Sequence, residues 1–147
     1  KMIQDKNVQG HSVTQRFEFW RTATQIFSES PIIGVGAGDV LSKYDETYEK
    51  QNTRLAKRYR LKAHNQYLSI LVAVGLIGLM IFLASIITPF LTINHANSFL
   101  YIGFCIILFS SMVNEDTLST QIGITLYAFF NSFLLYSLSA LPRKTRL

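Results

Sequence analysis

His64 and Arg16 are the two residues whose types and positions are best suited to chemistry. His64 stands where a polar segment meets a long apolar run. An imidazole changes its charge near neutral pH, so a histidine in this place can take a proton from a hydroxyl group. Arg16 offers a planar guanidinium that suits phosphate oxygens. The alternatives are a histidine that hydrogen-bonds the backbone at a helix start, and an arginine that pairs with Glu18 or reaches lipid headgroups.

A cluster of basic residues lies directly before the apolar run and consists of Arg54, Lys57, Arg58, Arg60 and Lys62. Each cation near an anionic surface contributes about 1 kcal/mol, so the cluster suits lipid headgroups or the phosphates of a substrate. A solvated loop explains the cluster equally well. Where the cluster does bind, we expect Arg58 and Arg60 to be the binding residues.

Three glycines at alternate positions, Gly34, Gly36 and Gly38, invite comparison with nucleotide-binding loops. No Lys-Ser or Lys-Thr pair follows them, and no strand-turn-helix unit with a downstream acid surrounds them. We therefore exclude a nucleotide loop. We expect these glycines to let the backbone turn tightly over a membrane surface, with amides of Gly34 and Gly36 free for an oxyanion.

Charge is distributed very unevenly along the 147 residues. Residues 1–62 contain 11 Lys/Arg and 7 Asp/Glu, whereas residues 63–142 contain only Glu115 and Asp116. A soluble fold exposes charged side chains every few residues, so the long uncharged stretch must face lipid or other spans. The single cysteine, Cys105, lies in this stretch, which predicts a small buried hydrophobe and no disulfide framework.

The uncharged stretch predicts three transmembrane helices, at about 67–91, 97–113 and 121–141. We expect Pro89 to break the first near its end, and Gly75 and Gly78 to let another helix approach it. Glu115 and Asp116 are expected in the turn that caps the third. The fold class is therefore an all-α integral membrane protein, and the chain, which opens on a polar segment, is expected to be a fragment of a larger multi-span protein.

Residues 1–66 form a polar, mostly helical segment in this interpretation. Apolar residues at helical spacing predict an amphipathic helix from about Gln15, capped by Ser12 or Thr14, with Phe17, Trp20, Ala23 and Phe27 on its apolar face. A turn-rich loop over 28–38 follows, and then a second helix capped by Asp39 that reaches towards Lys50.

A set of short motifs over residues 13–91 resembles the O-antigen ligase and polymerase family. Each motif is weak alone, but their order and spacing make the set specific. They are Arg16 with Trp20, then Ser30-Pro31-Ile32-Ile33-Gly34-Val35-Gly36-Ala37-Gly38, then Ala63-His64-Asn65-Gln66-Tyr67-Leu68, then Gly75-Leu76-Ile77-Gly78-Leu79.

The resemblance implies an enzyme that moves a glycan from an undecaprenyl pyrophosphate carrier to an acceptor hydroxyl at the periplasmic face of the bacterial inner membrane. It implies an inverting mechanism without a metal ion or other cofactor, in which Arg16 holds the pyrophosphate and His64 serves the acceptor. The further substrate-binding residues expected are Arg21, Gly34, Gly36, Arg58, Arg60 and Asn65, with Arg21 a weaker candidate than Arg16.

The resemblance also implies that residues 1–66 are a periplasmic loop and that the basic tail, residues 142–147, is cytoplasmic. The positive-inside rule favours the reverse, because the cluster has five basic residues and the tail three. Functional cations in a loop that handles phosphates can overrule this bias, so we follow the resemblance.

Several functions remain open within and outside this family. The acceptor is lipid A core in a ligase, which we favour, a growing glycan in a polymerase, or a protein hydroxyl in an O-oligosaccharyltransferase. The alternative from another class is a transporter or flippase subunit for a lipid-linked solute. The span interiors offer only Ser, Thr and an isolated Asn131, which counts against ion-driven transport. Membrane lipids are expected partners, and nucleic acid is not.

Overall fold

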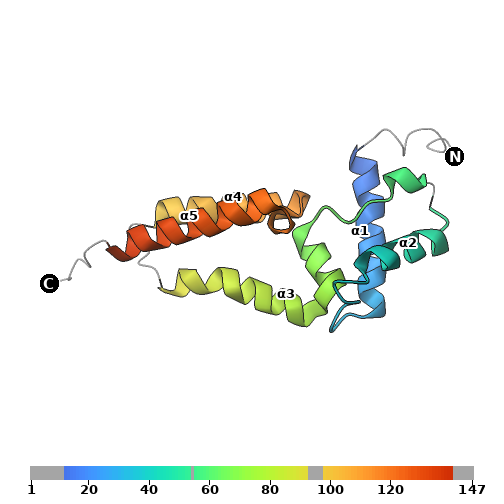
Figure 1. Cartoon of the computed structure of the whole chain (residues 1–147), viewed down its shortest axis with the longest axis horizontal. Coiled ribbons are helices and arrows are strands. Elements are labelled where there is room, and N and C mark those ends of the chain that lie inside the picture. Colours follow the sequence, from blue (N-terminus) through green and yellow to red (C-terminus); the bar gives the residue numbers. More distant parts are fainter. Residues whose placement is uncertain (1–11, 54, 93–97, 141–147) are drawn as a thin grey trace. The chain divides into compact units, whose positions relative to one another are not determined.

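The computed structural model describes residues 12–53, 55–92 and 98–140. Within these residues every regular element is a helix, which confirms the all-α prediction (Figure 1). Two compact units divide between Met80 and Ile81, inside the third helix. The elements are α1 (Ser12–Glu29), α2 (Val40–Lys50), the 3-10 turn η1 (Lys57–Tyr59), α3 (Gln66–Thr92), α4 (Phe99–Asn114), the 3-10 turn η3 (Thr117–Ser119) and α5 (Gln121–Ala140).

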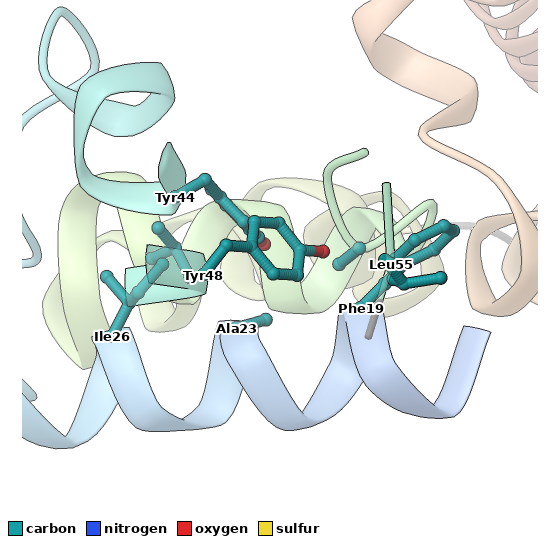
Figure 2. Packing of buried hydrophobic residues seen from close by; sticks show 8 residues of the cluster. Phe19, Ala23, Ile26, Tyr44, Tyr48 and Leu55 are labelled. Atoms are coloured by element: carbon teal, nitrogen blue, oxygen red, sulfur yellow. The ribbon is translucent and has the colours of Figure 1, made fainter. Parts of the chain in front are cut away.

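One stripe of α1 forms a side of the core of the first unit. Phe19, Ala23 and Ile26 lie four and three residues apart and are at most 3% exposed. They pack against Tyr44 and Tyr48 of α2, and Figure 2 shows the Tyr48 ring above Ala23. The sequence thus correctly predicted an amphipathic helix with Ala23 and Trp20 on its apolar face, but it wrongly placed Phe17 there.

Phe17 shows the size of that error. Its side chain is 66% exposed. It precedes Phe19 by two residues, which is about 200° around a helix with 3.6 residues per turn. A short pattern of apolar residues does not by itself show that a phenylalanine such as Phe17 faces away from the core.

A buried polar network joins α1 to α2. The Thr22 side chain is fully buried, and its hydroxyl donates to Gln51 Oε1 at 3.1 Å. The Gln51 amide in turn donates to Gln25 Oε1 at 2.6 Å. At the other end of α1, the Lys43 ammonium lies 2.8 Å from a Glu29 carboxylate oxygen. Because buried polar groups need partners, these contacts fix one register of α2 on α1.

Two predicted helix caps differ from the observed ones. The second helix begins after Asp39 as predicted, but Asp39 makes no side-chain cap hydrogen bond. Glu115 and Asp116 lie in the turn before α5 as expected, but Thr120 caps that helix. Its hydroxyl accepts a hydrogen bond from the Gly123 amide at 3.1 Å, which is the usual N-cap bond to the amide three residues later.

In the second unit, α4 and α5 run antiparallel. The Tyr101 hydroxyl donates to Asn131 Oδ1 at 2.9 Å, and the Phe104 ring stacks on Tyr127 with centroids 6.4 Å apart. Residue numbers therefore rise along α4 as they fall along α5. Cys105 is 2% exposed, which confirms the buried hydrophobe predicted for it.

Among the described residues, two helices are long and apolar enough to cross a membrane, at Gln66–Pro89 and Gln121–Leu138. Only 17% and 6% of their apolar stretches are buried, unlike the core helix of a soluble protein. The middle helix, α4, has 16 residues, about 24 Å, against the roughly 30 Å of a hydrocarbon core. Two of the three predicted spans thus have candidates. The basic tail lies outside the described residues.

The first predicted span is not one continuous helix. Gly75 has φ 66° and ψ −164°, which interrupts the helical backbone of α3. The prediction of an unbroken span is therefore wrong at this residue. Pro89, which was expected to break the helix near its end, lies inside α3, which continues to Thr92.

Candidate functional site

His64 lies at the junction of α1 and α3. The Trp20 indole N–H donates to the Ala63 carbonyl at 3.0 Å, directly before His64. The Phe19 ring lies against the His64 imidazole, with centroids 6.1 Å apart. One turn of α1 thus holds the backbone and contacts the ring of the candidate catalytic histidine.

The backbone of His64 is held in an unfavourable conformation. Its φ is +47°, in the left-handed region that costs a non-glycine residue about 1 kcal/mol. Asn65 follows as the cap of α3, and its Oδ1 accepts from the Leu68 amide at 3.0 Å. Fixed neighbours on both sides keep His64 in this conformation, which is the pattern typical of functional positions. Asn65 therefore has a structural role here, and its contact with substrate stays a prediction.

Arg16 lies on the face of α1 that meets the His64 segment. It precedes Trp20 by four residues, so the two side chains share a face and lie about 6 Å apart along the axis. Arg16 is half-buried, whereas Arg21, one residue past Trp20, is exposed. The structure thus brings Arg16, and not Arg21, to the helix face that packs beside His64.

Gly34 and Gly36 lie in a loop that is hydrogen-bonded to α3. The Val35 amide donates to the Val72 carbonyl and the Gly36 amide to the Ala73 carbonyl, both at 2.9 Å. The Gly34 amide donates to the Ser30 carbonyl at 3.0 Å. The expectation that the amides of these two glycines stay free for an oxyanion is therefore wrong, because both are used within the protein.

The same loop also accepts hydrogen bonds from the residues that follow the break in α3. The Leu76 amide donates to the Pro31 carbonyl at 2.9 Å, and the Ile77 amide to the Ile32 carbonyl at 3.2 Å. A helix break leaves amides and carbonyls without intrahelical partners. The loop therefore supplies partners to carbonyls before Gly75 and to amides after it.

Residues 34 and 75 are glycines because a side chain at either one would collide with the backbone of the other segment. A Cβ on Gly34 would lie 2.5 Å from the Ala73 carbonyl carbon, and a Cβ on Gly75 would lie 2.3 Å from the Ile32 oxygen. Both residues also have positive φ. The close approach predicted at Gly75 thus exists, but the partner is this loop and not a second helix.

The two arginines expected to bind substrate from the basic cluster differ sharply. Arg60 is 13% exposed, with its Nε–H donating to the Leu55 carbonyl at 3.1 Å and Nη1 to Glu49 at 2.6 Å. Arg58 is exposed and stacks on the Tyr59 ring at 4.7 Å. Arg60 therefore fastens the segment before α3, while Arg58 faces outward. Arg54 lies outside the described residues.

Two ionisable groups show how this segment is fastened. The hydrogen bond and charge of Arg60 hold the pKa of Glu49 below its ordinary value. Burial raises the pKa of Tyr48 to about 12, and its hydroxyl donates to the Leu61 carbonyl at 2.8 Å. Both contacts tie α2 to the chain just before His64.

Sequence reasoning missed the role of Trp20 and Phe19. The apolar pattern placed Trp20 on one face of its helix, but it did not show that the indole N–H donates to the Ala63 carbonyl. Phe19 has the buried spacing of Ala23 and Ile26, which is the signal that could have identified it. Among the described residues, no three His, Cys, Asp or Glu side chains gather as a metal site would require.

Comparison with known proteins identifies the group to which this chain is similar. It is 34% identical over 99 residues to a Haemophilus influenzae protein described as uncharacterized. That match covers 64% of this chain but only 24% of the relative, so the chain spans about a quarter of its length. The family model for O-antigen ligase matches residues 1–83, which include α1, the loop that follows it, His64 and the break in α3. The chain therefore belongs to the O-antigen ligase family.

Proposed function

We propose that the full protein transfers a glycan from an undecaprenyl pyrophosphate carrier to an acceptor hydroxyl. Family membership supports a role in handling lipid-linked glycans for polysaccharide biosynthesis. The observation that carries the assignment of residues is the docking of α1 on the His64 segment through the Trp20 to Ala63 hydrogen bond. Arg16 shares a helix face with Trp20, four residues later, which supports its assignment beside the candidate base.

The chemical step is a displacement at the anomeric carbon. The acceptor oxygen forms a bond to that carbon while the bond from carbon to the pyrophosphate oxygen breaks, and the bonding pair leaves on that oxygen. An imidazole nitrogen of His64 takes the acceptor proton. The guanidinium of Arg16 stabilises the negative charge that develops on the leaving pyrophosphate. The products are the glycosylated acceptor and free undecaprenyl pyrophosphate.

Arg21 and Arg58 are proposed to assist substrate binding, whereas Gly34 and Gly36 use their amides within the protein. Arg58 is the better placed of the two arginines, since its guanidinium is exposed and already stacked on Tyr59. Arg60 and Asn65 would act mainly by holding the segment that carries His64. As acceptor we propose lipid A core, with a growing glycan or a protein hydroxyl as the alternatives.

We also propose a topology of three spans. The middle helix, Phe99–Asn114, would cross a locally thinned bilayer, as short spans do. The first unit would lie on the periplasmic side of the bacterial inner membrane and residues 142–147 in the cytoplasm. Labelling of single cysteines in intact cells tests this order, and labelling of Asp45→Cys only after the inner membrane is opened would overturn it.

The decisive experiment uses the full protein in its native membrane. His64→Ala and Arg16→Ala are each expected to lower glycan transfer by about 100-fold or more, because each removes a group that acts in the transition state. Lys50→Ala, which removes an exposed cation on α2, is the matched control and should transfer normally. Immunoblotting of membranes checks that the protein level is unchanged.

Near-normal transfer by both variants would overturn the assignment. Reconstitution of the wild-type protein with labelled carrier separates the enzyme from a transporter. Glycan appearing on the acceptor indicates transfer, whereas movement of intact carrier across the vesicle membrane without glycan release would favour the flippase alternative.

A further inference from the structure

The loop tip, defined as residues 30–36, exposes two large aliphatic side chains. Ile32 is 63% and Ile33 69% exposed. No charged residue occurs between Glu29 and Asp39. An exposed apolar pair without nearby charge is unfavourable in water and indicates contact with another apolar surface.

Main-chain hydrogen bonds fix the loop tip against a candidate membrane span. The Pro31 and Ile32 carbonyls accept from the amides of Leu76 and Ile77, the first residues after the break in α3. The two backbones also approach each other closely, since a Cβ on Gly34 or on Gly75 would collide with the backbone of the other segment. The depth of Leu76 in the membrane therefore sets the depth of the loop tip.

The length of α3 places Leu76 at or within the hydrocarbon boundary. The uninterrupted helix from Leu76 to Thr92 is about 25 Å long, slightly less than the roughly 30 Å hydrocarbon core. All of it is needed to cross. In lipid, an unpaired backbone amide costs several kcal/mol, so a helix that starts there needs carbonyl partners from the protein. Pro31 and Ile32 provide them.

The exposed surface of α3 continues that of the loop tip. Leu76, Ile77 and Met80 are 51%, 53% and 61% exposed. Exposed apolar side chains therefore lie on both segments that meet at the hydrogen-bonded junction, Ile32 and Ile33 on the loop and Leu76, Ile77 and Met80 on α3. We propose that residues 30–36 are a re-entrant segment that enters the leaflet on the side of the first unit, with Ile32 and Ile33 in contact with lipid acyl chains.

This inference depends only on α3 being a membrane span, and not on the proposed glycan transfer. It replaces the expectation of a loop that turns over the membrane surface with one that enters the leaflet. The close approach of the loop to the span also accounts for glycine at residues 34 and 75, because a Cβ at either residue would collide with the other backbone.

The test places an environment-sensitive NBD fluorophore at single cysteines of the full protein in phosphatidylcholine vesicles, with Cys105 and any further cysteine replaced by alanine. Ile33→Cys reports the loop tip. Asp45→Cys, on the exposed side of α2, is the aqueous reference, and Met80→Cys is the reference within the span. All three side chains are exposed, so the substitutions do not disturb the core.

The proposal predicts that the label at residue 33 emits at a shorter wavelength than the label at residue 45. It also predicts stronger quenching by lipids spin-labelled near the headgroup than by lipids spin-labelled near the chain end. Emission like that of residue 45, with quenching by aqueous iodide, would overturn the proposal. Blue-shifted emission that neither lipid quenches would also overturn it, since another part of the full protein would then cover the loop tip.

Discussion

The two units of this chain differ in the apolar side chains that they expose. In the first unit, large side chains such as Tyr48 and Leu55 are 1% exposed and pack against each other. In the second, Ile107 and Ile122 are 72% and 75% exposed, while the small polar Ser98 is fully buried. Exposed large aliphatic side chains such as Ile107 and Ile122 are expected on helices that face lipid.

This difference explains where chemistry can occur. Polar side chains of the second unit pair with each other, as the Tyr101 hydroxyl does with Asn131 and Ser111 with Thr117 at 2.8 Å. In the first unit, polar contacts instead position a segment that ends in His64. Among the described residues, fixed positions and basic side chains coincide in the first unit, which is why we propose the site there.

The largest expected effect comes from the helix break that belongs to the first unit. Gly75→Ala should destabilise the protein by about 2–5 kcal/mol, since a Cβ would meet the Ile32 carbonyl and φ is positive. Thermal unfolding of the full protein in detergent, followed by size-exclusion chromatography, measures the effect. Gly103→Ala is the matched control, because a Cβ there meets nothing within 4 Å.

Equal melting temperatures for these two variants would contradict the interlocked junction. Gly34→Ala offers an independent check from the loop side. It should behave like Gly75→Ala, because its Cβ would collide with the Ala73 and Val74 backbone. If only one of the two glycines is sensitive, the contact between loop and α3 is not as close as described.

A leucine comparison tests the opposite burial directly. Leu55→Ala should cost about 2–5 kcal/mol, because it leaves a cavity in a core where this side chain is 1% exposed. Leu126→Ala in α5 removes the same atoms from a side chain that is 51% exposed and should cost about 0.5 kcal/mol. Unfolding of each variant by denaturant in mixed micelles checks the difference. A costly Leu126→Ala would show that α5 packs against protein and not lipid.

The sequence predicted most of this organisation through charge and periodicity. The uncharged stretch identified apolar helices, and the second polar helix was predicted to begin after Asp39 and reach Lys50, as α2 does. These features depend on local composition, which a single sequence displays directly. The resemblance to the O-antigen ligase family was confirmed for the same reason, since each of its motifs is a short stretch of the sequence.

Features that depend on distant partners were not predicted. Gly75 interrupts its helix because a loop about forty residues earlier in the chain supplies partners to amides and carbonyls at the break, and no local pattern shows that. Likewise the role of Trp20 depends on the Ala63 carbonyl, and that of Arg60 on Glu49 and Leu55. Residue type identified His64, but only tertiary contacts explain how its backbone is held.

A smaller and more local effect is expected at Trp20. Trp20→Phe keeps an aromatic ring but removes the hydrogen bond to Ala63, which is worth about 1 kcal/mol. If the bond positions His64, the variant should lose about tenfold in kcat with KM for acceptor nearly unchanged. Phe17→Leu, on the exposed side of the same helix, is the control. A purely structural role would lower the melting temperature and leave kcat per folded molecule intact.

The smallest effect is a pH dependence that only the first unit should show. Arg60 holds the pKa of Glu49 below its ordinary value of 4.5, by hydrogen bonding first and by charge second. The stabilisation is fully present above 4.5 and is lost as the pH falls through the lowered folded value. Because the Glu49 side chain is 58% exposed, screening keeps the effect small.

Glu49→Gln should therefore lower the melting temperature slightly at neutral pH and converge with wild type in acid. Asp45→Asn, at an exposed carboxylate of the same helix, should leave the curve unchanged. A Glu49→Gln difference that persists at pH values where Glu49 is protonated in both the folded and the unfolded protein would show that the ion pair with Arg60 does not cause it.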